Sequence, residues 1–365
     1  MKINGTNWRT IWLQQDGNSI GVIDQRKLPH QFICKAIYNY EEAAEAIQNM
    51  SVRGAPLIGV TGAYGLMLAL QEDASDKNLE KAFEKLISTR PTAINLSWAL
   101  NRVKAIVKPL PPKLRANAAK KEAQLIAEED VTMCKRIGEK GYEILNQLSR
   151  KRDLSERDKP INILTHCNAG WLATVDWGTA LAPIYQAHRA GLKVHVWVDE
   201  TRPRNQGASL TSYELGCEGI PYTVIVDNAG GHLMQNGQVD VVIVGSDRTT
   251  SRGDVCNKIG TYLKALAAND NSVPFYVALP SSTIDWSIVN GLKEIPIETR
   301  SELEVLQLQG QLENGEVQTV KLCPPSSKGF NPAFDVTPSR LITGLITERG
   351  VISPNYKNLK KAFSE

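Results

Sequence analysis

The stretch Ile161-Asn-Ile-Leu-Thr-His-Cys-Asn-Ala-Gly170 changes character halfway along its length. Its first five residues are mostly apolar and β-branched, which predicts a buried β-strand. The chain then breaks into small and polar residues, and the pattern of residues 171–190 predicts a helix. Because the first amides of a helix are unpaired and carry partial positive charge, the end of such a strand is a place where α/β proteins hold ligands.

Cys167 lies at this predicted junction of strand and helix. A thiol beside the positive end of a helix is favoured as the thiolate, the reactive form of cysteine. The alternative is a small core residue, because free cysteines are often buried. The local context leaves both interpretations open.

The composition is that of an ordinary soluble protein: 42% of the 365 residues are hydrophobic, 22% are charged, and the net charge is +3. This length is enough for two domains with separate cores. The small net charge does not call for a nucleic-acid partner, and no apolar run reaches membrane-spanning length. The six cysteines form no Cys-x-x-Cys pair and the start of the chain does not resemble a signal peptide, so we expect a cytoplasmic protein.

The second half of the sequence alternates between strand and helix patterns. Strands are predicted at 161–165, 193–198, 222–226, 239–244 and 275–279. Such alternation predicts a parallel, doubly wound sheet, in which ligands bind beyond the carboxyl ends of the strands.

The first half predicts a smaller mixed α+β region. Short strands are expected at 8–13, 20–24 and within 31–40, and helices at 41–50, 60–70, 97–107 and 114–148. The charged stretch 149–160 follows the long last helix. We take it as the junction between two domains, residues 1–150 and 151–365.

Residues with useful chemistry follow several of the predicted strands. Gln206 stands at the start of a helix, and Asn257 and Lys258 are expected to open another helix that runs to residue 268. A lysine near a helix start is a plausible phosphate ligand. Asp247 follows an apolar strand and is either a buried carboxylate with a raised pKa or a simple turn cap.

Two loops of the first half carry arginines. Arg53 lies in Ser51-Val-Arg-Gly-Ala-Pro-Leu-Ile-Gly59, a tight turn before a helix, which suits either anion binding or a plain connection with a surface arginine. Arg90 lies in a similar loop. The sequence contains no dinucleotide-binding or Walker pattern, and its five histidines lack metal-like spacing, so we expect no cofactor and no metal.

Taken together, seven segments resemble one enzyme family over nearly the whole chain. They are Arg53-Gly-Ala-Pro-Leu-Ile-Gly59, Arg90-Pro-Thr-Ala-Ile-Asn-Leu96, His166-Cys-Asn-Ala-Gly170, Glu200-Thr-Arg-Pro-Arg-Asn-Gln-Gly207, Gly245-Ser-Asp-Arg248, Gly253-Asp-Val-Cys-Asn-Lys-Ile-Gly-Thr261 and Asn331-Pro-Ala-Phe-Asp-Val-Thr-Pro338. This series resembles the methylthioribose-1-phosphate isomerases of methionine salvage. Their wider superfamily includes ribose-1,5-bisphosphate isomerases and regulatory subunits of the exchange factor for eukaryotic initiation factor two.

The resemblance implies a set of site residues and a fold. It implies Cys167 and Asp247 as the catalytic pair, and substrate contacts from Arg53, Gly54, Ala55, Arg90, Gln206, Asn257 and Lys258. It also implies a homodimer whose subunit has a small N-terminal domain and a Rossmann-like C-terminal domain. Departures from the family pattern at Ser246, Cys256 and the segment 248–253 remove no functional group.

The implied reaction converts 5-methylthio-α-D-ribose 1-phosphate into 5-methylthio-D-ribulose 1-phosphate. The anomeric phosphate locks the sugar as a ring, so a neutral carboxylic acid such as Asp247 is expected to protonate the ring oxygen. Hydrogen then moves from C2 to C1, either as a proton removed by Cys167 or as a hydride. Trp171 and the helix after Arg53 are candidates to contact the methylthio group.

Three alternative functions stay open at this point. The protein could act on ribose 1,5-bisphosphate or on 5-deoxyribose 1-phosphate, or it could be a regulatory homologue that binds a sugar phosphate without turnover. The presence of both Cys167 and Asp247 argues against the last.

Overall fold

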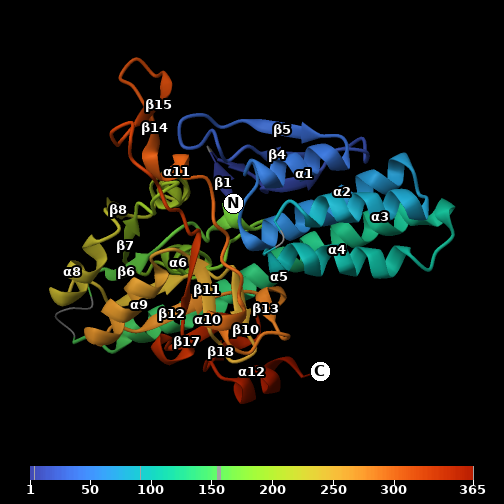
Figure 1. Ribbon diagram of the computed structural model, residues 1–365. Coiled ribbons are helices and arrows are strands. Elements are labelled where there is room, and N and C mark those ends of the chain that lie inside the picture. The colour runs from blue at the N-terminus through green and yellow to red at the C-terminus, as the bar shows by residue number, and fades with distance from the viewer. Residues whose placement is uncertain (4, 91, 154–157, 365) are drawn as a thin grey trace.

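The computed structural model describes residues 1–3, 5–90, 92–153 and 158–364. A seven-stranded sheet lies in the C-terminal half of the chain (Figure 1). The order across the sheet is β18-β17-β12-β9-β6-β7-β8. All neighbouring strands are parallel except β17 and β18. Its strands are β6 (Ile161–Thr165), β7 (Val194–Asp199), β8 (Tyr222–Ile225), β9 (Val241–Val244), β12 (Phe275–Ala278), β17 (Gly344–Thr347) and β18 (Gly350–Ile352).

The strand order reverses between β6 and β9. From β6 the chain moves outward through β7 and β8, and it then returns to β9 and continues the opposite way through β12 and β17. This is the doubly wound order in which a crevice opens at the reversal, beyond the carboxyl ends of the two central strands. Cys167 follows β6 and Asp247 follows β9, so the fold places both residues at that crevice. The expected mostly parallel sheet is confirmed.

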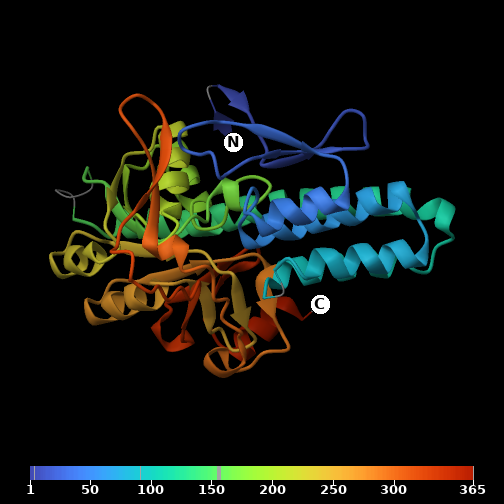
Figure 2. The same cartoon turned by 45° about the horizontal axis from the view of Figure 1, so that its top comes forward.

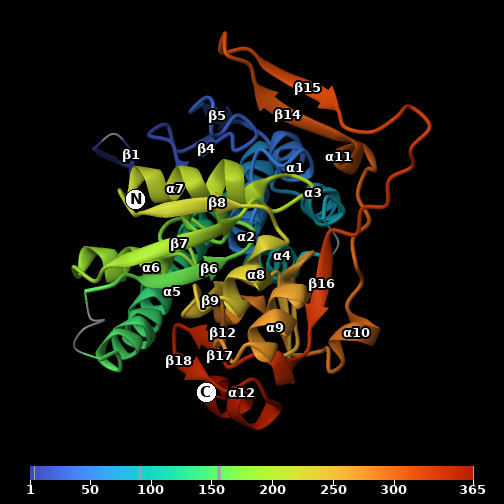
Figure 3. The same cartoon turned by 90° about the vertical axis from the view of Figure 1, so that its left-hand side faces the viewer.

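Helices cover both faces of this sheet (Figure 3). They are α6 (Ala182–Arg189), α7 (Ser212–Cys217), α8 (Ala229–Gln235), α9 (Thr261–Asp270) and α12 (Tyr356–Phe363). A second sheet has the order β13-β10-β11-β16, with β10 (Arg248–Thr250), β11 (Val255–Lys258), β13 (Ile284–Asp285) and β16 (Phe334–Thr337). Short helices α10 (Gly291–Glu294) and α11 (Leu303–Leu306) precede a hairpin, β14 (Gln307–Gln311) and β15 (Val317–Lys321), which stands away from the body (Figure 2).

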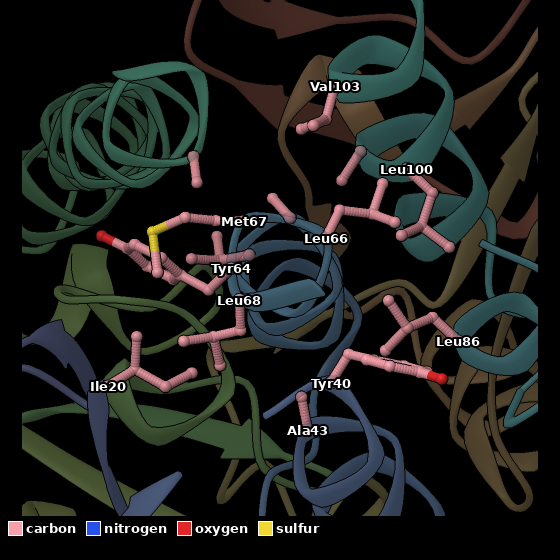
Figure 4. Close-up of a cluster of buried hydrophobic side chains, with 14 of the residues drawn as sticks. Ile20, Tyr40, Ala43, Tyr64, Leu66, Met67, Leu68, Leu86, Leu100 and Val103 are labelled. Atoms are coloured by element: carbon pink, nitrogen blue, oxygen red, sulfur yellow. The ribbon is translucent and has the colours of Figure 1, made fainter. Parts of the chain in front are cut away.

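The N-terminal half is built around one apolar helix. The central helix is α2 (Ala55–Glu72). The other elements of this half are β1 (Lys2–Ile3), β2 (Thr6–Asn7), β3 (Ile11–Leu13), β4 (Ile20–Ile23), β5 (Cys34–Ile37), α1 (Tyr40–Gln48), α3 (Asp76–Ile87), α4 (Ile94–Val107) and α5 (Pro112–Arg150). Almost all of α2 is apolar and buried, as expected of a helix surrounded on all sides. In Figure 4, side chains of β4, α1, α3 and α4 converge on Tyr64, Leu66, Met67 and Leu68 of α2.

The burial of α2 fixes the position of its N-terminus, where Arg53 and Gly54 lie. Gly54 has a backbone φ of 100°, and a Cβ there would stand 2.4 Å from the Cα and the carbonyl oxygen of Ala173. Only glycine allows this close approach of the two halves of the chain. The start of α2 is thereby set against the loop that follows Cys167.

The long helix α5 packs against α2 and α4 on one side and against α6 and β17 on the other. It ends at Arg150, and the expected domain junction at 149–160 includes residues 154–157, which lie outside the described residues. Within the described part of the chain, no helix combines the length and apolarity that crossing a membrane requires.

Candidate active site

Cys167 sits in a strained backbone conformation at the end of β6. Its φ is 68°, in the left-handed region that residues other than glycine rarely adopt. The Cys167 amide donates to the Thr201 hydroxyl at 2.8 Å, and the Cys167 carbonyl accepts from the Thr211 hydroxyl at 2.8 Å. The Sγ atom lies 3.5 Å from Oε1 of Gln206. Strain that neighbouring groups hold in place is typical of functional sites.

The helix expected at residues 171–190 is wrong in its first half. A single 3-10 turn at Trp171–Ala173 is followed by irregular chain, and α6 begins only at Ala182. The amides of Trp171 and Leu172 are taken by the buried carboxylate of Glu214, at 3.0 and 2.9 Å. They therefore do not point toward the crevice.

The protonation state expected of the Cys167 thiol changes as a result. No helix begins directly after Cys167, and burial raises the pKa of the thiol although Arg53 and Lys258 oppose the rise. The expectation that a helix terminus favours the thiolate is thus wrong. A neutral thiol in a nearly closed site is the form that the surroundings favour.

Asp247 is half-buried and lines a small, largely apolar cavity. Ala55, Arg90 and Phe334 line the same cavity. The Asp247 amide donates to the carbonyl of Cys256 at 2.9 Å, which fixes the backbone. Burial raises the pKa of the carboxyl, and the cations Lys258, Arg90 and Arg53 oppose this without reversing it. A raised pKa is the direction of shift that a proton-donating carboxyl requires.

Three predicted cations surround the thiol and the carboxyl. Arg53 is buried and donates through Nη2 to the backbone carbonyl of Asn168 at 2.8 Å and through Nη1 to the Asn168 side chain. Burial lowers the pKa of Arg53 and of Lys258, while Cys167 and Asp247 raise both. Arg90 is paired with Glu298 at 3.0 Å. The five ionisable side chains predicted from sequence therefore form one electrostatic cluster.

Lys258 reaches this cluster from a strand and not, as expected, from a helix start. It is the last residue of β11, opposite Phe334 of β16, and its Nζ lies 4.7 Å from the centre of the Phe334 ring. The helix α9 begins later, at Thr261, after Gly260 in a left-handed conformation. Pairing with β16 accounts for the difference, because the four residues Val255–Lys258 find strand partners that sequence alone does not reveal.

The remaining predicted residues lie around the same centre. Gly54 and Ala55 begin α2, whose N-terminus has no side-chain cap. Gln206 lines a second, more polar cavity together with Arg53, Lys27 and Arg204. The side-chain amide of Asn257 is buried and donates to the Thr261 hydroxyl at 3.0 Å.

Trp171, expected to contact the substrate, is fully buried in the core of the larger half and lines neither cavity. The expectation for Trp171 is therefore wrong. The helix after Arg53 does line the apolar cavity, through Ala55 and Ile58.

Sequence reasoning missed a buried network beneath the site. The side-chain amide of Asn168 donates to Glu214 at 3.1 Å while its oxygen accepts from Arg53, and Tyr185 also donates to Glu214. Burial raises the pKa of Glu214 to about 7, although its hydrogen bonds lower it. Asn168 belongs to the conspicuous motif after β6, but nothing in the sequence around Glu214 marks it.

A second buried cluster lies behind His166. Its Nδ1 is 2.7 Å from the Asp199 carboxylate, and its Nε2 is 2.8 Å from the Ile259 carbonyl. His166, Asp199 and Asp227 lie close enough together to hold a metal ion. However, the Lys264 ammonium is 3.1 Å from Asp199 and donates to the Asp227 carbonyl. The Lys264 ammonium therefore supplies the positive charge that a metal ion would bring. His166, Asp199 and Asp227 form an internal ion-pair cluster with it.

Comparison with known proteins places this chain in a family. The family model described as the initiation factor 2 subunit family matches residues 51–354. Within this broad class, proteins named methylthioribose-1-phosphate isomerase from Methylocella silvestris and Methylorubrum extorquens are 59% and 58% identical over all 365 residues and 99% of their own length.

Solved structures agree with this placement. A 5-methylthioribose 1-phosphate isomerase from Pyrococcus horikoshii OT3 superposes with a TM-score of 0.83 at 41% identity, covering 100% of this chain and 99% of that one. A structure described as translation initiation factor eIF-2B, subunit delta, from A. fulgidus gives 0.78 at 39% identity, covering 98% and 100%. The chain belongs to the initiation factor 2 subunit family and, within it, to the methylthioribose-1-phosphate isomerases.

Proposed function

We propose that the protein is an aldose–ketose isomerase that converts 5-methylthio-α-D-ribose 1-phosphate into 5-methylthio-D-ribulose 1-phosphate, a step of methionine salvage. One observation carries the proposal: a carboxyl with a raised pKa and a thiol follow the two central strands, and three cations surround them. The names of the relatives that match over the full length point the same way.

In the proposed mechanism Asp247 is the acid. Its raised pKa keeps a proton available, which the carboxyl delivers to the ring oxygen as the bond to C1 breaks. Arg53, Arg90 and Lys258 hold the phosphate, together with the amides at Gly54 and Ala55, Gln206 and Asn257. The phosphate remains attached, because these groups bind it without protonating its bridging oxygen.

Hydrogen moves from C2 to C1 beside Cys167. In one route the Cys167 sulfur, in the thiolate form, removes the C2 proton, and the enediol that forms is reprotonated at C1. In the other a hydride shifts from C2 to C1 as the C2 hydroxyl gives its proton to the Asp247 carboxylate, while the thiol shapes the electrostatics of the pocket. The two routes differ in the fate of the C2 hydrogen. Deuterium at C2 is retained in the ketose if a hydride moves, and is exchanged with solvent if a proton is removed to a group in contact with water.

The apolar cavity beside Asp247 suits the uncharged C5 end of the substrate. Ala55, Ile58 and Phe334 supply apolar contacts there. The two arginines at this cavity already have acidic partners: Arg90 pairs with Glu298, and Arg248 lies 3.5 Å from Asp285. A second phosphate would therefore lose water without gaining a free cation, at a cost of several kcal/mol.

The deciding experiment is turnover by the purified protein. Incubation with the methylthio substrate, without added metal or cofactor, is expected to give the ketose, and Asp247→Asn is expected to lower kcat by about two to four orders of magnitude with a smaller change in substrate affinity. Competition with ribose 1,5-bisphosphate is expected to favour the methylthio substrate by at least about a hundredfold in kcat/KM. Absence of turnover by the wild type would instead support a regulatory homologue.

The proposal includes an organisation for the whole protein. We assign residues 1–150 to a small N-terminal domain and 151–365 to a Rossmann-like catalytic domain, in a cytoplasmic homodimer that needs no cofactor. Measurement of the mass in solution, by light scattering, tests the homodimer.

A further inference from the structure

A chain of ion pairs runs from the site to Arg204, which lines the second cavity. It begins at Arg90, whose Nη2 and Nε lie 3.0 and 3.1 Å from one oxygen of Glu298. The other oxygen of Glu298 accepts from Arg300 at 2.7 Å. Arg300 also binds Glu304, which accepts from Arg204 at 2.9 Å. Glu298 is the first acidic residue of this chain of ion pairs. It is the one that contacts Arg90, a residue proposed to bind the substrate phosphate.

The environment of Glu298 keeps it ionised. Its side chain is 19% exposed, and although burial works against the charge, Arg90 and Arg300 lower the pKa of this carboxyl. Its backbone carbonyl accepts from the Ala333 amide at 2.8 Å, so the main chain is held as well. A fixed negative charge therefore stands beside the site at neutral pH.

Glu298 acts on two residues of the site: it hinders phosphate binding by Arg90, and it favours the protonated form of Asp247. It occupies the guanidinium of Arg90, so a phosphate group must displace it or share the arginine with it. Its charge also raises the pKa of Asp247. The residues just before it, Ile295 and Pro296, line the apolar cavity together with Asp247, which places the segment at the same site.

We propose that Glu298 is a positioning residue that holds Arg90 until phosphate arrives and keeps a negative charge near the proton donor Asp247. This inference rests on the proposed function, because it assigns Glu298 a part in turnover. Phosphate consequently binds more weakly, and the Asp247 carboxyl stays protonated over more of the pH range.

Other charges also act on Asp247 and must be held constant in any test. Lys258 and Cys256 face it from β11, Arg248 from β10, Arg53 and Arg90 from the loops before α2 and α4, and Cys167 from the end of β6. None of these residues is replaced in a Glu298 variant, and among their described contacts only that of Arg90 with Glu298 is changed.

The test compares Glu298→Gln with Glu304→Gln. The first removes the negative charge next to Arg90; the second removes a carboxylate from the same ion-pair chain without contact to Arg90. For Glu298→Gln we expect inorganic phosphate to bind about three- to tenfold more tightly, by calorimetric titration, and KM to fall. We also expect the basic limb of the pH profile of kcat to move to lower pH, so that kcat falls at pH 8 and not at pH 6.

A purely structural ion pair would give a different result. The two variants would then behave alike, with weaker phosphate binding and an unmoved basic limb, and that outcome overturns the inference. If Glu298→Gln does not fold, Glu298→Asp is measured instead. Its shorter side chain keeps the negative charge but moves it away from Arg90. Tighter phosphate binding with a wild-type pH profile supports the inference, and unchanged or weaker binding overturns it.

The two proposals can fail separately. If the wild type does not turn over the methylthio sugar phosphate, the proposed function fails, and the phosphate titrations still decide whether Glu298 restrains Arg90. If the wild type is active and Glu298→Gln matches it in both affinity and pH profile, only the inference about Glu298 fails.

Discussion

Cys167 shows how a single residue can be correctly singled out for a partly wrong reason. The change from apolar to polar residues after position 165 marks the end of a strand, and the strand ends there. The helix expected directly after it begins only at Ala182, and the thiol is buried with a raised pKa. Its proposed role therefore rests on the neighbouring Asp247, Arg53 and Lys258, and not on a helix terminus.

Replacing the thiol by a hydroxyl tests that role. We expect Cys167→Ser to fold normally and to lose about two to four orders of magnitude in kcat, because a hydroxyl is similar in shape but a far weaker acid. Steady-state kinetics on the methylthio substrate measures the loss. Cys34→Ser, at an exposed cysteine, serves as the control. Retention of near wild-type kcat by Cys167→Ser would remove the residue from the mechanism.

The cations of the site are expected to act mainly on affinity. Arg53→Ala and Lys258→Ala each remove a charge-assisted contact of roughly 1.5–3 kcal/mol, so phosphate should bind about ten- to a hundredfold more weakly. Titration with inorganic phosphate gives the affinity, with Lys113→Ala at an exposed position of α5 as the control. Unchanged affinity in both site variants contradicts their assignment as phosphate ligands.

At the scale of elements, five strands of the large sheet are predicted from sequence within about two residues, whereas β17 and β18 are missed. The strand at 161–165 has the predicted bounds, because its β-branched residues are buried and flanked by abrupt polar breaks. The sequence predicts a helix start at Lys258, because the four residues of β11 carry no strong strand pattern. The Glu214 network lay beyond prediction, since it depends on the path of the chain between 171 and 181.

The contact between α2 and the loop after Cys167 offers a sharp test at this scale. Gly54→Ala places a methyl group 2.4 Å from the backbone of Ala173 and strains a φ of 100°. We expect a loss of about 2–4 kcal/mol in the free energy of unfolding and a larger fall in activity, because Arg53 moves with the loop.

Gly216→Ala provides the matched control. Gly216 lies in α7, where the nearest atom to an added Cβ is the Tyr222 hydroxyl at 3.6 Å. Alanine there is expected to be neutral or stabilising by up to about 1 kcal/mol. Urea unfolding and turnover of the two variants, measured side by side, give the comparison. Equal stability of both variants would show that the contact with Ala173 relaxes at little cost.

At the scale of the whole molecule, the short segment 171–175 joins the two halves of the chain. The N-terminal half reaches it through the Thr10 hydroxyl, which donates to the Trp171 carbonyl at 2.8 Å, and through the Gln25 amide, which donates to Leu172 at 2.7 Å. The larger half contributes Glu214. Such connections between distant segments could not be predicted from sequence, because no local pattern records them.

Asp130 completes this junction from α5 and makes stability depend on pH. It is 2% exposed and accepts from the Val175 amide at 2.7 Å. Burial raises its pKa from 3.8 to about 7, despite the hydrogen bonds that lower it. The folded protein therefore binds a proton that the unfolded chain releases, and the free energy of unfolding falls as pH rises between about 4 and 7.

The variant Asp130→Asn removes this titration while keeping an oxygen to accept from Val175. Relative to the wild type, we expect it to gain on the order of 2–3 kcal/mol between pH 5 and pH 8.5, since each pKa unit corresponds to about 1.4 kcal/mol. Urea unfolding at the two pH values measures the gain, and Asp270→Asn, at an exposed end of α9, should show none. A constant difference between Asp130→Asn and wild type across this range would mean that Asp130 stays ionised in the folded protein. The junction would then be held by a buried charge rather than by a protonated carboxyl.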